Sequence, residues 1–209
     1  MSGDTAGGVV LEPLSGETLR AALPDLAALR IRVFREWPYL YAGDADYERR
    51  YLATFAAAPG AVVIGARDPG SGRMVGAATG CPLAHADPAF AAPFRAAGHD
   101  PADWFYFGES VLEPTHRGRG IGVAFFTARA AQARAQGFAR ACFCAVVRDA
   151  GDPRASAGHT PLDAFWTRRG YRRLDLTTSF PWREVDAAAE SDHPMAFWGR
   201  ELTDGQSKS

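Results

Sequence analysis

The sequence predicts an α/β fold in which helices flank a central mixed β-sheet, and three observations support this class. The 209 residues are 47% hydrophobic and 22% charged, a balance typical of one soluble globular domain. Apolar runs of strand length alternate with segments whose apolar residues recur at helical spacing. Turn-forming Gly and Pro residues separate these segments. Such alternation is typical of a sheet with helices packed on it.

The first half of the chain is expected to supply three strands and two helices. Thr18 can cap the first helix, in which Pro24 suggests a break, and Asp44 can cap the second. The turn-forming run at 68–72 joins two strands as a hairpin. The expected elements are strands at 9–14, 61–66 and 74–81, one helix from Thr18 to Phe34 and one from Asp44 to Pro59.

The second half is expected to continue the sheet after an insertion at 82–103, which contains a short helix at about 90–97. The expected elements are strands at 104–112, 140–147, 172–180 and 195–202, and helices at 121–136 and 161–169. The sheet then has six to seven strands with about four flanking helices. One domain covers 9–203, and flexible tails are expected at 1–8 and 204–209.

Composition excludes several classes of function. The net charge of −1 argues against a general nucleic-acid binder, because neutralising phosphates requires a basic excess. No segment has the length and apolarity of a membrane span, and the first residues do not resemble a signal peptide. Cys81, Cys142 and Cys144 do not have metal-ligand spacing, so we expect reduced core thiols, no metal site and a cytoplasmic protein.

A glycine-rich turn between an expected strand and an expected helix is the motif that carries chemistry. Its backbone N–H groups can bind phosphate at a helix N-terminus. A P-loop requires Gly-Lys-Ser/Thr, but Gly122 is followed by Val123 and Ala124. A dinucleotide fingerprint requires a third glycine at position 123, where Val stands. The residues of the turn are Arg117, Gly118, Arg119, Gly120, Ile121 and Gly122.

This turn resembles the acyl-CoA-binding motif Q/R-x-x-G-x-G/A of the GNAT superfamily of N-acetyltransferases, with Arg117, Gly120 and Gly122 at its defined positions. The segment 164–171 is similar to the helix that follows the motif in this family and ends in Gly-Phe/Tyr. The resemblance covers 104–180 by motif and most of the chain by element order. It implies the GNAT fold.

The resemblance also implies a site. Acetyl-CoA would bind in a gap where the strands at 104–112 and 140–147 splay apart. Its pyrophosphate would lie on the N–H groups of the glycine-rich turn, and its pantetheine arm would pair with the main chain of Val111 and Leu112. The acetyl group would pass directly to an amine of a small molecule or peptide, without a covalent enzyme intermediate. Homodimers are common in this family, so a homodimer is a further expectation.

Glu109 is the candidate catalytic base, because partial desolvation in an aromatic run makes a carboxylate a better proton acceptor. The alternatives are that Glu109 binds the substrate ammonium or pairs with an arginine. Trp166 stands where many relatives have a tyrosine that protonates the leaving thiolate, and an indole cannot do so. Tyr106, Tyr171 or a water molecule are the replacements considered.

Two other functions remain open at this stage. Trp166 also fits a CoA-binding sensor or a degenerate member that does not transfer. Transfer of a longer acyl group, or transfer to oxygen, is the other alternative. The walls of an acceptor site are expected from the two N-terminal helices, the loop at 37–41 and the insertion at 82–103.

Overall fold

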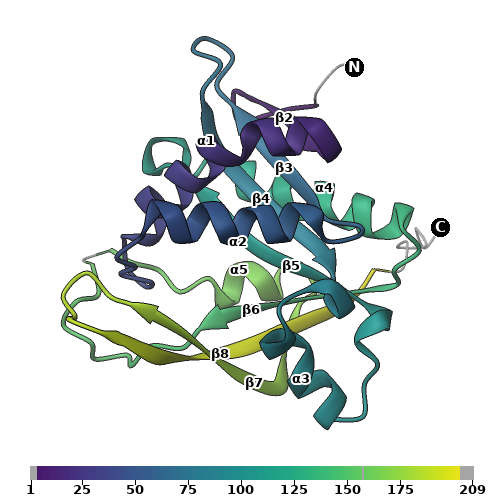
Figure 1. Cartoon of the computed structure of the whole chain (residues 1–209), viewed down its shortest axis with the longest axis vertical. Helices are drawn as coiled ribbons and strands as arrows, with labels where there is room; N and C mark the ends of the chain where they lie inside the picture. Colours follow the sequence, from purple (N-terminus) through teal and green to yellow (C-terminus); the bar gives the residue numbers. More distant parts are fainter. Residues whose placement is uncertain (1–3, 157, 203–209) are drawn as a thin grey trace.

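The computed structural model describes residues 4–156 and 158–202, which form an eight-stranded mixed sheet with helices on both faces (Figure 1). The strand order is β1-β2-β3-β4-β5-β6-β8-β7, and all neighbours are antiparallel except β5 and β6. The strands are β1 (Asp4–Ala6), β2 (Val9–Leu14), β3 (Val62–Arg67), β4 (Met74–Pro82), β5 (Trp104–Leu112), β6 (Arg140–Val146), β7 (Arg172–Arg183) and β8 (Glu190–Glu201). The helices are α1 (Gly16–Phe34), α2 (Ala45–Ala57), α3 (Pro88–Ala96), α4 (Ile121–Ala135) and α5 (Asp163–Thr167).

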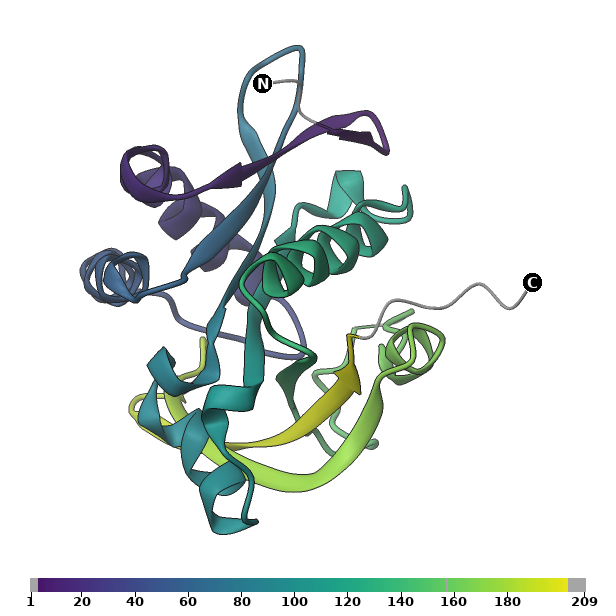
Figure 2. The same ribbon diagram turned by 90° about the vertical axis from the view of Figure 1, so that its right-hand side faces the viewer.

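Helices cover the central strands from both sides. Figure 2 shows α1 and α2 on one side of β3, β4 and β5, and α4 on the other. The side chains of β4 are buried along its whole length, as expected of a strand covered on both faces. One hydrophobic cluster lies under α4 and another under α1 and α2. The predicted class, a mixed sheet with helices on it, is confirmed.

The structure corrects the N-terminal prediction at three points. Asp4–Ala6 is a strand where a tail was expected, because Gly7 and Gly8 both have positive φ and form a tight hairpin turn to β2. This strand raises the sheet to eight strands. Ser15, not Thr18, is the N-cap of α1, and Thr18 Oγ1 accepts a hydrogen bond from Ser15 N (3.2 Å). Pro24 does not interrupt α1, and it lies on the exposed face of that helix.

Other boundaries follow the predictions more closely. The side chain of Asp44 accepts a hydrogen bond from Tyr47 N (2.7 Å) and caps α2 as expected. Helix α4 begins at Ile121, as predicted, whereas α5 is shorter than expected. The short helix expected in the insertion is present as α3, which brings the described helices to five. The tail predicted at 204–209 lies outside the described residues.

The parallel strands β5 and β6 splay apart, as the fold class predicted. They pair at only three positions, the last of which is Tyr106 with Cys142. The register of β5 against β4 also shifts between Ala78 and Gly80, so β5 bulges at Gly108. Only glycine fits there, since a Cβ at Gly108 would lie 2.4 Å from Thr79 Oγ1. This bulge turns β5 away from β6 at Glu109.

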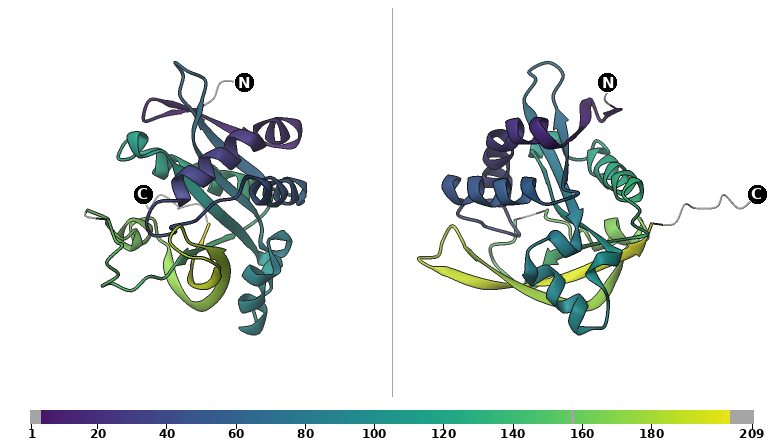
Figure 3. Two further views of the ribbon diagram at one scale, coloured as in Figure 1. Left: turned by 60° about the vertical axis from the view of Figure 1, so that its left-hand side comes forward. Right: turned by 45° about the vertical axis from the view of Figure 1, so that its right-hand side comes forward.

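A long, curved hairpin of β7 and β8 forms the other end of the sheet, and α3 packs on β7 (Figure 3). Its extension at 183–185 is joined to the loop between α1 and α2. We call that loop, residues 35–43, the strap. Ala42 N donates to Arg183 O (2.8 Å), and Val185 N donates to Leu40 O (2.7 Å). The strap therefore connects the N-terminal helices to the C-terminal hairpin.

The three cysteines, Cys81, Cys142 and Cys144, are free and buried, in agreement with the prediction of core thiols. Burial raises the pKa of Cys81 and of Cys144 to about 12, which keeps both thiols protonated. Within 4–156 and 158–202, no helix is long and apolar enough to cross a membrane. The same residues contain no group of three or more His, Cys, Asp or Glu side chains arranged to hold a metal ion.

Candidate functional site

The glycine-rich turn forms an open cradle at the N-terminus of α4. Gly118 and Gly120 have positive φ, and nothing lies within 4 Å of a Cβ built on either. Gly120 is the N-cap of α4, so the N–H groups of Ile121 and Gly122 have no acceptor within the helix. These donors and the helix dipole favour an anion above the turn. The cradle thus fits the pyrophosphate expected there.

The two arginines of the cradle differ in their contacts. Arg117 Nε donates to Leu112 O (3.1 Å), and Arg117 Nη1 pairs with Glu36 Oε2 (2.9 Å), so this side chain ties the cradle to β5 and to the strap. Arg119 is exposed, and its main chain packs against the β1–β2 turn at Gly7. Backbone donors are therefore the main phosphate-binding groups that the cradle offers.

The direction of the β5 main chain decides which groups can pair with a pantetheine arm. Glu113 N donates to Val75 O on β4 (2.9 Å). Because main-chain groups alternate in direction along an antiparallel ladder, those of Val111 also face β4. Those of Ser110 and Leu112 face the gap. Of the two residues named from the sequence, only Leu112 presents its main chain to the gap, and Ser110 joins it there.

Arg129, a buried residue of α4, supports the bulge from the opposite side. Its guanidinium donates to Thr79 O and to Glu109 O (both 3.2 Å) and to Ser110 Oγ (2.8 Å). It lies over the ring of Phe107. Burial lowers the pKa of Arg129 to about 10, which leaves it charged at neutral pH. The carbonyl groups of Thr79 and Glu109, which lie at the bulge, thereby have a hydrogen-bond donor.

Glu109 lies at the point where β5 leaves β6, on the face covered by α1 and α2. Its carboxylate forms an ion pair with Arg30 of α1, and Arg30 Nε also pairs with Glu48 Oε2 of α2 (2.5 Å). Glu48 is fully buried, and the side chain of Glu109 is 10% exposed. Burial opposes the charge of Arg30, but Glu109 and Glu48 outweigh it and raise the pKa of Arg30. Arg30 therefore holds two carboxylates in place.

A pocket of about 370 Å³ opens in front of Glu109, and we call it the acceptor pocket because the resemblance predicts an amine acceptor beside this residue. Elements from both halves of the chain line it, including α1, α2, the strap, α3, β5 and the β7–β8 hairpin. Its polar groups include Arg30, Glu48 and Glu109. Its wall is rich in aromatic rings: Phe34, Tyr39, Tyr41, Tyr47, Tyr51, Phe90, Tyr106, Phe180 and Trp182. The pocket contains the predicted base and the predicted walls.

A second pocket, of about 500 Å³, lies along the part of β6 that has left β5. It is lined by residues 145–150, by Trp166 of α5 and by Tyr39 of the strap. Trp166 packs on Phe143 and Trp198, with ring centroids 5.1 Å apart in both pairs. Tyr39 lines this pocket and the acceptor pocket, so this residue lies where the two meet.

The tyrosines considered from the sequence are held by packing. Tyr171 is buried among Phe107, Phe126 and Phe143, and burial raises its pKa to about 12. The hydroxyl of Tyr106 contacts Cys144 Sγ (3.1 Å), and burial raises its pKa well above the usual value. From the sequence, Tyr39 was expected only as part of the loop at 37–41 that could line the acceptor site, and no proton-donating role was predicted for it.

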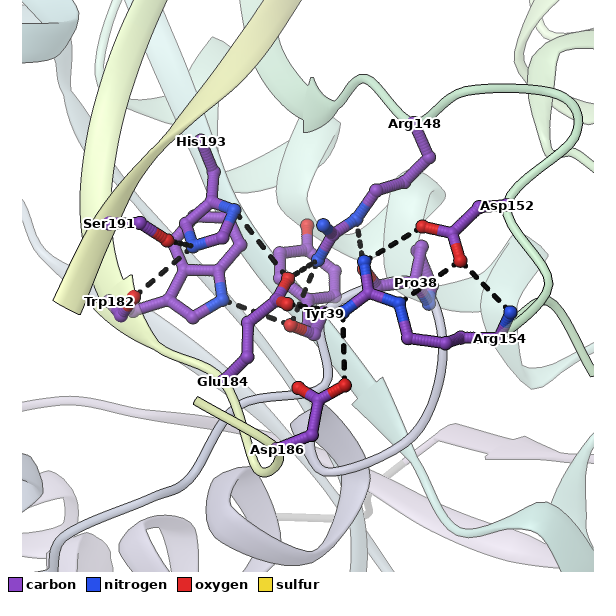
Figure 4. A network of polar contacts seen from close by, with 10 residues as sticks. All are labelled: Pro38, Tyr39, Arg148, Asp152, Arg154, Trp182, Glu184, Asp186, Ser191 and His193. Carbon is purple, nitrogen blue, oxygen red and sulfur yellow. Dashed lines mark hydrogen bonds and ion pairs between the residues drawn. The ribbon is translucent and has the colours of Figure 1, made fainter. Parts of the chain in front are cut away.

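A network around Glu184 holds Tyr39 and the strap (Figure 4). Glu184 pairs with Arg148 (2.6 Å) and Arg154 (2.5 Å). The main-chain oxygen of Tyr39 accepts from Arg148 Nη2 (3.1 Å) and from Trp182 Nε1 (2.9 Å). Burial opposes ionisation of Glu184, but hydrogen bonds from Arg154 and Arg148 lower its pKa. The backbone position of Tyr39 is thus fixed by charged and aromatic partners.

The fold of this chain is similar to the fold of solved acetyltransferases of the GNAT superfamily. A phosphinothricin acetyltransferase of this superfamily from Sinorhizobium meliloti, solved with AcCoA, matches with TM-score 0.60 and 15% identity over 97% of this chain and 92% of that chain. A ribosomal-protein-alanine N-acetyltransferase from Brucella melitensis matches with TM-score 0.59 and 15% identity, over 92% and 99%.

A GCN5-related N-acetyltransferase from Kribbella flavida is also similar, with TM-score 0.55 and 18% identity over 91% of this chain and 97% of that chain. No family model and no curated protein sequence matches this chain. The likeness therefore lies in the fold, and the chemistry has to be argued from the residues of this chain.

Proposed function

We propose that this protein transfers an acetyl group from acetyl-CoA to a primary amine in the cytoplasm. The observation that carries the proposal is the position of Glu109. It lies just beyond the last pairing of β5 with β6, with the cradle at the end of the same strand and the acceptor pocket in front of its carboxylate. A donor bound along the gap and an amine bound in the pocket would meet there. The complex of a similar fold with AcCoA supports the choice of donor.

Binding of the donor would use backbone groups. The pyrophosphate would accept hydrogen bonds from the N–H groups of the cradle, and the pantetheine arm would pair with Ser110 and Leu112. The open space above Gly118 and Gly120 fits phosphate oxygens that approach the main chain. Direct transfer then forms one N–C bond and breaks one C–S bond, and the amine loses a proton while the thiolate gains one.

Glu109 would orient the amine and accept its proton, directly or through water. Glu109 forms an ion pair with Arg30, and pairing with an arginine was one of the alternatives considered from the sequence. That contact does not remove the carboxylate from the pocket, since Glu109 lines the pocket. Arg30 would act as a positioning residue that aims the carboxylate at the amine.

Tyr39 would supply the proton to the leaving thiolate. It lines both pockets, whereas Trp166, at the position usual for this role, has no acidic proton to give. Burial, followed by the charges of Cys144 and Glu109, raises the pKa of Tyr39. The phenol therefore remains protonated at neutral pH and is available as a donor.

The test is release of free thiol from acetyl-CoA in the presence and absence of a panel of amines. Release that depends on an amine, with the acetylated amine identified by mass, supports transfer. A non-catalytic CoA-binding protein remains the alternative because of Trp166. Tight CoA binding without turnover of any amine would favour that alternative, and competition among acyl-CoA esters would reveal a longer acyl donor.

A further inference from the structure

We propose that the acceptor pocket takes a compact primary amine with an aromatic body and no carboxylate beside the amino group. This inference rests on the acetyl transfer proposed above and names the class of acceptor. The small volume of the pocket, its aromatic wall and its balance of charge each point to this class.

The strap and the β7–β8 hairpin close one side of the pocket. The strap and the β7–β8 hairpin are joined by two main-chain hydrogen bonds, which together form an isolated β-bridge between Tyr41 and Glu184. Arg148 strengthens this closure, because its Nε donates to Pro38 O (2.6 Å) while its guanidinium pairs with Glu184 (Figure 4). A peptide acceptor continues beyond its amine and requires an open groove. The volume of about 370 Å³ is instead at the small end of the range for small-molecule sites.

Stacked rings form one wall of this pocket. Phe90 stacks on Tyr106 and on Phe180, with centroids 4.9 and 5.4 Å apart. Trp182 adds a further ring, and Tyr39 lies 5.8 Å from it. A flat aromatic body would pack on these rings more favourably than a short aliphatic chain, because aromatic pairs add to the free energy of burial.

The charges of the pocket favour a cation and disfavour a carboxylate. Arg30 is the arginine deep in the pocket, and both Glu48 and Glu109 already pair with it. The other arginines of the lining, Arg50 and Arg183, are exposed to solvent, where an ion pair contributes little. The lining contains three arginines and four carboxylates, a net charge of −1. An ammonium group would be attracted to Glu109, whereas an adjacent carboxylate would be repelled by the same groups.

The experiment compares matched amines as acceptors for the intact protein with acetyl-CoA. 2-Phenylethylamine and phenylalanine differ only in the carboxylate, and 2-phenylethylamine and ethylamine differ only in the ring. We expect kcat/KM for 2-phenylethylamine to exceed both others by at least tenfold, and a tripeptide with N-terminal phenylalanine to be a still poorer substrate. Equal or faster turnover of phenylalanine or of the tripeptide would overturn the inference.

A variant tests the aromatic wall separately. Phe180→Leu should lower the ratio of kcat/KM for 2-phenylethylamine over ethylamine at least fivefold, with the dissociation constant of acetyl-CoA unchanged. An unchanged ratio in the folded variant would contradict the assignment of the wall.

If no amine releases thiol, the proposed acetyl transfer fails. Calorimetry then tests the inference about the pocket by measuring the dissociation constants of 2-phenylethylamine and phenylalanine. Binding of 2-phenylethylamine that is tighter than that of phenylalanine supports the inference, and equal or absent binding refutes it.

Discussion

The cradle and the acceptor pocket are built in opposite ways, although they meet at one strand. The cradle is six consecutive residues whose working groups are mainly backbone N–H donors, held open by glycines with positive φ. The acceptor pocket draws charged and aromatic side chains from both ends of the chain. Backbone donors are the same whatever the side chains are, so they suit a fixed chemical group such as a pyrophosphate. The side chains of the pocket come from many elements and can be substituted one at a time, so they can determine which acceptor is bound.

The largest effect is expected from a substitution in the cradle. Gly120→Asp should weaken acetyl-CoA binding at least a hundredfold, because a negative side chain would occupy the space for phosphate. Calorimetry measures the dissociation constant. Gly98→Asp is the matched control, since Gly98 also has positive φ and open space around it, but lies beyond α3. Unchanged affinity in folded Gly120→Asp would remove the phosphate assignment.

The next effect is expected at the base. Glu109→Gln should lower kcat about a hundredfold while the affinity for acetyl-CoA stays the same, since general base catalysis contributes roughly that factor or more. Glu48→Gln is the comparison, because it removes the other carboxylate from Arg30. We expect its kcat to fall less than tenfold. Similar losses in both variants would show that displacement of Arg30, and not loss of a base, explains the effect.

A smaller effect is expected at the proposed acid. Tyr39→Phe should lower kcat about tenfold at every accessible pH, because a thiolate is a fair leaving group without assistance and the raised pKa of Tyr39 keeps the phenol protonated throughout that range. Tyr171→Phe removes a phenol that packs in the core under α4, and its kcat should stay at the level of the unchanged protein. A kcat for Tyr39→Phe equal to that of the unchanged protein would exclude Tyr39 as the acid.

The smallest effect concerns the network that fixes the strap. Because the pKa of Glu184 is lowered in the folded state, its stabilising contribution is present above the pKa of an unfolded glutamate and is lost as pH falls through the folded value. Glu184→Gln should therefore lower the melting temperature by a few degrees near neutral pH. On acidification, the melting temperature of the variant should fall less than that of the unchanged protein. A parallel acid dependence in both proteins would contradict this assignment.

The sequence predicted the cradle better than the pocket for a physical reason. A helix N-terminus and its glycines are local, so Gly118 to Gly122 could be interpreted from adjacent residues. Glu109 was chosen from its strand, but its partner Arg30 lies 79 positions earlier and is brought to it only by packing of α1 on the sheet. Tyr39 was one of several aromatic residues in a loop, and the contacts that hold it come from 148 and 182. Nothing in the local pattern marked these long-range contacts.

The most direct test of the account is a crystal structure of this protein with acetyl-CoA. We expect its pyrophosphate to lie within hydrogen-bond distance of the N–H groups from Gly118 to Gly122. We expect its pantetheine arm to pair with the main chain of Ser110 and Leu112, and its thioester to lie between Glu109 and Tyr39. A donor bound away from the cradle, or a thioester on the far side of β5 from Glu109, would contradict the account.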